Sequence, residues 1–258
     1  MTIRFVIITV ACLVAISTLP AIALDHGNLD EGRPLHIQDA YPVSLGELVV
    51  EAGAGFAWRR HSSDHGFFPV QFVYGILPNT QLELGTTFFT SPHNIDNPGK
   101  SGDTSIGVLY NFNQETLTLP AFALKGSLQL PTGVDSSGIE SEVTGIVTKS
   151  FHRLTLSFNA GYLFIGGHNR DERNGRYKFV FGGGYPVGVP MHTRTVILAD
   201  VFLNQAASRG ERKTLGGEIG LRHQLRERLV LDLGVGSEFS GPVNRSPLYV
   251  NAGFSFGF

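Results

Sequence analysis

The residues with the clearest chemical potential are charged side chains that recur at every second position of short segments. Alternate residues of an extended chain point to the same side, so each segment carries its charges on one polar face. Eight acids and four bases are assigned to this face, which indicates a hydrated surface with a cation bias. The same residues could form salt bridges that fill an interior, and the sequence leaves both interpretations open. The twelve candidates are Glu51, Arg59, Glu83, Asp103, Lys125, Glu142, Lys178, Asp200, Glu218, Arg222, Asp232 and Glu238.

Other groups of reactive side chains give weaker signals. His61, Asp64 and His65 have the composition of a metal site, but they fall in a short loop without a cysteine or a second cluster. Ser141 and His168 lie in neighbouring connections, as a lipid hydrolase would need, yet their local spacing suggests no dyad. No G-x-S-x-G, phosphate-binding or dinucleotide-binding motif is present. We therefore expect no catalytic residue, no metal and no cofactor, and predict that the protein is not an enzyme.

The elements that must position the charged face are strands. In the last segment, Leu248 to Phe258, the side chains alternate between apolar and polar without a break, which is typical of a strand with two unlike faces. Segments 142–149 and 194–206 alternate least cleanly. Many polar-face positions are glycine, which leaves room for a solute or lets a sheet curve closed. The twelve expected strands are 46–60, 67–77, 80–90, 103–112, 119–130, 142–149, 154–165, 176–186, 194–206, 214–224, 229–240 and 247–258.

A soluble β-sandwich and a transmembrane barrel both fit an alternating pattern, and four features favour the barrel. The segments have the roughly ten residues of a tilted spanning strand. Longer connections, such as 91–102, 132–141 and 166–175, alternate with short ones. Apolar-face aromatics gather at segment ends, and the chain ends on Phe258. We predict an all-β fold, a single antiparallel up-and-down transmembrane β-barrel of about 12 strands with both termini periplasmic.

Aromatic residues at the two ends of the apolar face predict two girdles at the membrane interfaces. We assign Trp58, Phe88, Phe164, Tyr177 and Phe239 to the outer girdle, and Tyr74, Phe112, Tyr185 and Phe256 to the inner one.

Composition narrows the class of protein further. Residues 1–23 have the basic start, apolar stretch and Ala-Ile-Ala end of a cleaved secretory signal peptide, which predicts export through that signal to the bacterial outer membrane. The one cysteine, Cys12, lies inside this signal, so the exported part has no disulfide. A net charge of −2 without a basic run argues against nucleic-acid binding. We expect a periplasmic N-terminal segment over 24–45 and the barrel over 46–258.

Several stretches resemble one bacterial family of outer-membrane transporters, named for the meta-cleavage pathway of phenol degradation. They are Arg33–Pro42, Gly46–Glu51, Leu128–Gly133, Asn159–Tyr162, Leu231–Gly236 and the Phe-terminated last strand. The resemblance implies an outer-membrane barrel that passes small aromatic or hydrophobic molecules. One departure is Asp200, where the family leads us to expect Glu.

We therefore expect passage of small solutes along the charged inner face, and the resemblance implies that they are aromatic or hydrophobic compounds. The expected partners are outer-membrane lipid, lipopolysaccharide, the small-molecule solute and the barrel-assembly machinery, which would bind the C-terminal strand at Phe258. Two alternatives stay open: a structural or adhesive barrel with a plugged lumen, and, with less support, a membrane-embedded lipid hydrolase.

Overall fold

Antiparallel pairing runs from each strand to its neighbour and closes into a ring, because the first strand pairs with the last on one side and with the second on the other. The structure is a computed structural model that describes residues 29, 33–90, 100–133, 138–166, 172–189 and 193–258. Its strands are β1 (Leu48–Trp58), β2 (His65–Leu77), β3 (Thr80–Thr90), β4 (Lys100–Ser101), β5 (Thr104–Asn111), β6 (Ala121–Leu130), β7 (Glu140–Phe151), β8 (Leu154–Ile165), β9 (Gly175–Val187), β10 (Thr195–Asn204), β11 (Thr214–Arg226), β12 (Leu229–Ser240) and β13 (Leu248–Gly257).

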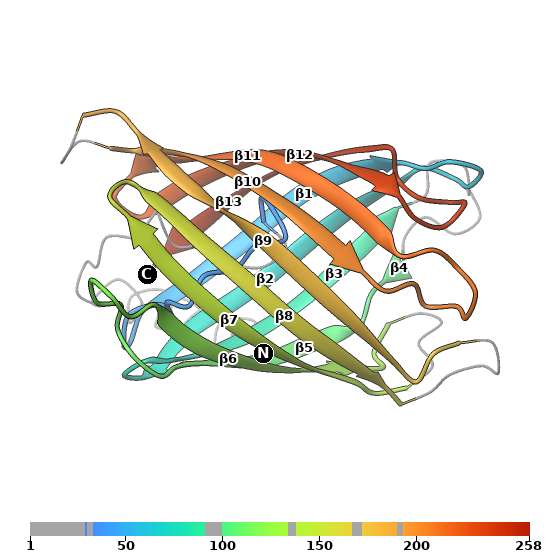
Figure 1. The fold of residues 1–258 in the computed structure, drawn as a ribbon, viewed down its shortest axis with the longest axis horizontal. Coiled ribbons are helices and arrows are strands. Elements are labelled where there is room, and N and C mark those ends of the chain that lie inside the picture. Colours follow the sequence, from blue (N-terminus) through green and yellow to red (C-terminus); the bar gives the residue numbers. More distant parts are fainter. Residues whose placement is uncertain (1–28, 30–32, 91–99, 134–137, 167–171, 190–192) are drawn as a thin grey trace, which may run out of the picture.

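The two-residue β4 and the longer β5 both pair with β3, so they form one barrel strand that is interrupted at Gly102 and Asp103. The barrel closes on itself (Figure 1). With β4 and β5 taken as one, it has the twelve strands that the sequence predicts. Each predicted segment overlaps its strand, and the expected strand 142–149 extends to Glu140–Phe151. At one end of the barrel, Asn79 and His152 have positive φ values of 63° and 56° in two-residue turns, a conformation that tight hairpin turns require.

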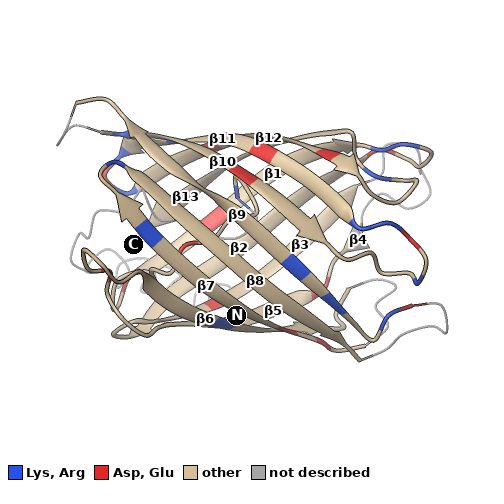
Figure 2. Ribbon diagram, in the orientation of Figure 1, with Lys and Arg blue, Asp and Glu red and all other residues tan. Residues whose placement is uncertain are grey.

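The outer surface of the barrel is an apolar belt. Large side chains such as Phe72, Phe181, Ile219 and Leu233 are exposed by 46%, 50%, 62% and 58%, far more apolar surface than a water-soluble monomer leaves open. Charged residues gather near the two ends and occur only singly along the strands (Figure 2). Within the described residues, no helix has the length and hydropathy to cross a bilayer. A belt of this kind is stable only in contact with lipid.

The interior is occupied by the segment that precedes β1. We call residues 33–45 the N-terminal strap. We expected residues 24–45 in the periplasm, but the structure places the strap inside the barrel (Figure 1). Arg33, Ile37, Gln38 and Ala40 are less than a tenth exposed there. The physical reason is that several inward-facing positions of the wall are apolar and need cover from water.

Three apolar clusters join the N-terminal segment to the wall. Leu29, Leu35 and Ile37 pack with Val180, Val196, Leu198 and Phe202. Val43 packs with Val49, Val73 and Val230, and Ala40 packs with Leu109, Ala121, Ala123 and Ile146. The inward side chains from β10 and β7 explain why the sequence pattern is least clean over 194–206 and 142–149. In those strands both faces are partly apolar, one toward lipid and one toward the strap.

The lipid-facing belt gives a direct test. Leu233, near the middle of β12, points outward, so Leu233→Arg places a charge in hydrocarbon and should lower the free energy of unfolding by about 2–4 kcal/mol. Urea titration of the protein in lipid vesicles measures this. Leu117→Arg is the control, because Leu117 is 99% exposed in the connection between β5 and β6. Equal stability of the two variants would show that β12 does not face lipid.

Candidate functional site

The candidate site is the barrel interior, where side chains from the wall hydrogen-bond the backbone of the strap. The amide of Ile37 donates to Asp200 Oδ2 at 2.9 Å, and that of Ala40 donates to Thr148 Oγ1 at 2.9 Å. Farther along the strap, the amide of Val43 donates to Gln81 Oε1 at 2.8 Å. An extended segment away from other strands would otherwise leave these buried amides without partners, at a cost of roughly 1–3 kcal/mol each.

Three inward-facing asparagines hold the strap through its carbonyls. Asn159 accepts from the Gln38 amide and donates to the Gln38 carbonyl, both at 2.8 Å, which is the pairing that a neighbouring strand would provide. Asn111 Nδ2 donates to the Ala40 carbonyl at 2.7 Å, and Asn251 Nδ2 donates to the Pro34 carbonyl at 2.8 Å. The polar face of β5, β8 and β13 is therefore matched to one particular chain segment.

Some inward glycines make room for the strap. A Cβ atom added to Gly75 would lie 2.0 Å from the Ser44 carbonyl oxygen, and one added to Gly234 would lie 2.6 Å from the Pro34 carbonyl oxygen. At Gly220 the added atom would lie 3.0 Å from the Pro34 ring. Only glycine allows so close an approach of two chains. At these positions the glycines accommodate the strap, which sequence reasoning did not foresee.

A buried ion network ties the start of the strap to the wall. Arg33 pairs with Glu51 of β1 and lies 3.9 Å from Asp232 of β12. Arg222 of β11 pairs with Asp232 at 3.0 Å and donates to Ser255 Oγ, which donates to Glu51 at 2.9 Å. All five residues are less than a tenth exposed. Two cations and two carboxylates balance there only because the strap supplies Arg33.

Two further pairs neutralise other predicted interior charges. Lys125 Nζ lies 2.7 Å from Glu83, and Lys125 also reaches Gln38 Oε1 of the strap at 3.4 Å. Lys178 of β9 pairs with Glu142 of β7 across β8. The structure thus brings most of the predicted interior charges together as ion pairs, so the cation bias inferred from the eight acids is largely compensated.

Asp200 and Glu218 differ from the other interior acids. They are directly opposite each other on β10 and β11, and both are 5% exposed. His36 of the strap lies against this pair: its amide and its Nδ1 both contact Glu218 Oε2 at 2.8 Å. Tyr249 donates to the other oxygen of Glu218 at 2.7 Å. These contacts bring two carboxylates and one imidazole together.

The remaining three charged candidates lie at the ends of strands. Arg59 follows β1, is exposed, and its amide donates to Asp64 Oδ1. Asp103 accepts from the amide of Gly133 at 2.9 Å, and Glu238 accepts from the amide of Ser246 at 2.6 Å. β1 ends at Trp58, so the alternation that predicts an inward position no longer applies at Arg59, and its place on the lumen stays a prediction.

The aromatic candidates lie at the ends of the outer face. Trp58, Phe88, Phe164, Phe239, Tyr74, Phe112 and Tyr185 are between 40% and 60% exposed, whereas Tyr177 and Phe256 are half-buried. Phe256 packs edge-on against Phe258 at 4.9 Å, and the Phe258 amide donates to the Leu48 carbonyl at 2.9 Å. Their roles as girdles and as an assembly signal stay predictions.

The described residues do not arrange the hydrolase candidates or the metal-loop candidates into a site. Ser141 is paired with Phe164 in the ladder between β7 and β8, and His168 lies outside the described residues. Asp64 accepts a backbone hydrogen bond within its own loop, and His61 has a left-handed φ of 52°. This local bonding is typical of a solvated turn.

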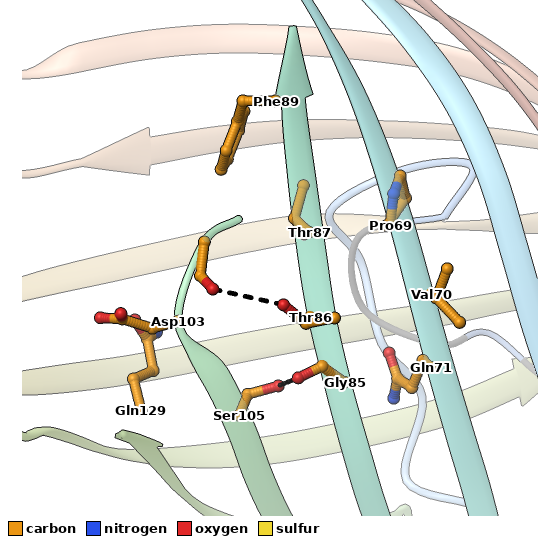
Figure 3. Close-up of a pocket in the computed structure, with 11 residues that line it drawn as sticks. Pro69, Val70, Gln71, Gly85, Thr86, Thr87, Phe89, Asp103, Ser105 and Gln129 are labelled. Carbon is orange, nitrogen blue, oxygen red and sulfur yellow. Dashed lines mark hydrogen bonds between the residues drawn. The ribbon is translucent and has the colours of Figure 1, made fainter. Parts of the chain in front are cut away.

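A cavity of about 320 Å³ opens where β2 and β3 face the break between β4 and β5 (Figure 3). Its lining combines amide, carboxylate and hydroxyl groups from Gln71, Asp103, Ser105 and Gln129 with the ring of Phe89. Ser105 donates to the Gly85 carbonyl at 3.2 Å, which holds the wall together beside the cavity (Figure 3). This volume is at the lower end of small-molecule sites.

At the opposite end of the barrel, Tyr41 anchors the strap outside the spanning strands. Its hydroxyl donates to Glu115 Oε2 at 2.9 Å, and Lys149 pairs with Glu115 Oε1 at 3.1 Å. Burial raises the pKa of Glu115, but hydrogen bonds from Lys149, Tyr41 and Ser150 outweigh it and hold the pKa below the usual range. Burial, followed by the neighbouring Glu115 carboxylate, raises the pKa of Tyr41.

Residues 32–256 match the family described as "Putative MetA-pathway of phenol degradation". The chain belongs to this family. The match includes the strap and all twelve barrel strands except the last residue of β13. No curated protein matches the sequence significantly.

Solved structures of outer-membrane barrels share the fold of this family member. An outer membrane channel from Pseudomonas putida F1 superimposes with a TM-score of 0.64 at 12% identity, covering 90% of this chain and 100% of that one. The NanC porin gives 0.61 at 9% identity, covering 80% and 98% of the two chains, and the KdgM porin gives 0.54 at 9%, covering 81% and 99%. At these identities the likeness is one of fold.

The buried ion network can be tested through Arg222. Arg222→Met removes one cation and leaves buried carboxylates under-compensated, so the free energy of unfolding should fall by about 3–5 kcal/mol. Arg176→Ala is the control: that ion pair with Glu140 is 3.8 Å long and partly exposed, and its loss should cost only about 0.2–1 kcal/mol. Urea titration in vesicles compares them, and equal losses would refute a stabilising role for the network.

The Tyr41 anchor predicts a pH dependence. A carboxyl group with a lowered pKa stabilises the fold above its unfolded pKa, roughly 4.3 for Glu, and loses that contribution as pH falls through the folded pKa. Wild type should therefore be more stable than Glu115→Gln at neutral pH, and the difference should vanish in acid. Unfolding titrations at several pH values measure this. A difference that persists in acid would mean that the charge of Glu115 is not responsible.

Proposed function

We propose that this protein is an outer-membrane channel for small solutes, with single-ring aromatic compounds as the class to test first. The observation that carries the proposal is a closed twelve-strand barrel with an apolar exterior, a charged and polar interior and a cavity of about 320 Å³ inside one end. The family description and the three barrel neighbours support the same reading. A cavity with both amide groups and the Phe89 ring suits a small molecule that has one polar and one aromatic part.

The orientation and export of the protein belong to the same proposal. Residues 1–23 act as the signal peptide, and both termini lie on the periplasmic side, where the short turns at Pro78–Asn79 and His152–Arg153 would also lie. The cavity would then open toward the outside. The barrel-assembly machinery would bind the C-terminal strand at Phe258. Lipopolysaccharide would surround the outer rim of the barrel.

The strap lies in the path that a solute would take through the barrel. Its contacts extend from Gln81 on β3 around the wall to Asn251 on β13, so it crosses much of the barrel interior. Solutes that enter the cavity must pass between strap and wall or displace the strap. We infer that the strap acts as an internal gate, held by hydrogen bonds and ion pairs of the wall. Passive flow would then depend on how readily the strap leaves its position.

A reversible cross-link tests this gate. Ala40 lies against Thr148, and a chain that begins at Leu24 contains no natural cysteine, so Ala40→Cys with Thr148→Cys introduces one defined pair. Oxidation should lower single-channel conductance and solute uptake by liposomes several-fold, and a thiol reductant should restore both. Each single-cysteine variant, treated in the same way, is the matched control.

Two other results would change the conclusion. Conductance that is unaffected by a verified cross-link would refute the gate while leaving a channel. Absence of conductance and uptake in the reduced protein, and also in a folded chain without residues 24–43, would refute passage. The second result would favour a structural barrel with a plugged lumen, which is the alternative that the filled interior itself supports.

A further inference from the structure

We propose that His36, Asp200 and Glu218 form a binding site for a divalent transition-metal ion of the zinc class, which fastens the strap to the barrel wall. Each residue offers one ligand atom, and these atoms lie within 4.8 Å of one another. His36 comes from the strap, whereas Asp200 and Glu218 come from adjacent strands β10 and β11. A bound ion would therefore connect two parts of the chain that only tertiary structure brings together.

The charge balance of the interior points to a cation at this position. Glu51 and Asp232 face two arginines, while Glu83 and Glu142 each face a lysine. Within the described residues, Glu218 pairs with a histidine, His36. Like charges directly opposite on neighbouring strands destabilise a sheet, and burial increases the penalty. A divalent cation would neutralise both carboxylates at once.

An unsatisfied oxygen is the second observation. Asp200 is only 5% exposed. Its Oδ2 accepts a hydrogen bond from the Ile37 amide, whereas its Oδ1 has no hydrogen-bond partner. Buried carboxylate oxygens are expected to be paired. Beside Asp200 lie the two other ligand atoms, one from His36 and one from Glu218. Hydrogen bonds from the strap and from the wall orient Glu218.

The donor set and geometry favour a zinc-class ion. One imidazole nitrogen with two carboxylate oxygens is a three-ligand set that suits zinc and its neighbours, whereas calcium and magnesium prefer oxygen alone. Ligand atoms around tetrahedral zinc lie roughly 3.3 Å apart, and Nδ1 of His36 is 2.8 Å from Glu218. Small rotations of the carboxylates would complete the arrangement. The His36 side chain is 41% exposed, which leaves one side open for a water ligand.

Supporting contacts hold the ligands as metal sites require. Tyr249 donates to Glu218 Oε1, leaving Oε2 directed at His36. The ring of His36 rests on Phe202, with centroids 4.4 Å apart. Such neighbours fix ligand orientation and raise metal affinity. The site does not depend on solute passage and can be tested apart from it.

The experiment uses the full chain that begins at Leu24, folded in detergent micelles, treated with EDTA and then equilibrated with Zn²⁺. Calorimetry and metal analysis should give one Zn²⁺ per chain. Co²⁺ bound in place of Zn²⁺ should give the visible absorption of an ion with few ligands, which are nitrogen and oxygen atoms. Asp200→Asn and His36→Gln should each weaken binding at least ~10-fold. His223→Gln is the matched control, because the His223 ring contacts Thr195 and lies outside the cluster.

Three outcomes would overturn the proposal. Wild type could bind no Zn²⁺ in a defined ratio. Binding could be unchanged in both His36→Gln and Asp200→Asn, which would place the ion on exposed histidines. Wild type could also fail to bind while Asp200→Asn is more stable at neutral pH, which would show that a shared proton compensates the carboxylate pair. His36→Gln alters only the strap, so it remains informative even where Asp200→Asn does not fold.

Discussion

The structure depends on one constraint: a chain segment inside a closed barrel must find partners for its backbone. Within the described residues, the strands of the wall pair on both sides apart from the two-residue β4, so their edges are not available to the segment inside. Inward side chains take the place of a neighbouring strand, most clearly where Asn159 both donates to and accepts from Gln38. The polar residues of the lumen are therefore arranged to hold a particular segment as well as to contact water.

This constraint accounts for features that would otherwise be unrelated. Glycines such as Gly75 and Gly234 stand where the strap approaches the wall closely. Val196, Leu198 and Phe202 face inward because Leu35 and Ile37 cover them. Arg33 completes a buried charge network that would otherwise hold more negative than positive charge. In the proposed channel, permeability would therefore depend on the strap as much as on the wall.

The sequence predicts the barrel well because period-two alternation follows from lipid on one side and polar groups on the other. It predicts the charged interior for the same reason, since Glu51, Asp200 and Asp232 fall on the inward register. It could not predict the pairing of these charges, because Arg33 and His36 lie in a polar, irregular stretch with no periodicity. The weak alternation of 194–206 is the signal that could have revealed a filled lumen: inward apolar residues need something to pack against.

In this structure the strap is a fixed part of the barrel interior, held through its backbone. Hydrogen–deuterium exchange on the folded protein in lipid measures this directly, residue by residue. The amides of Ile37, Gln38, Ala40 and Val43 should exchange slowly, with protection close to that of the barrel strands. Exchange of these amides as fast as in an unstructured peptide, with the strands still protected, would show that the wall does not hold the strap in place.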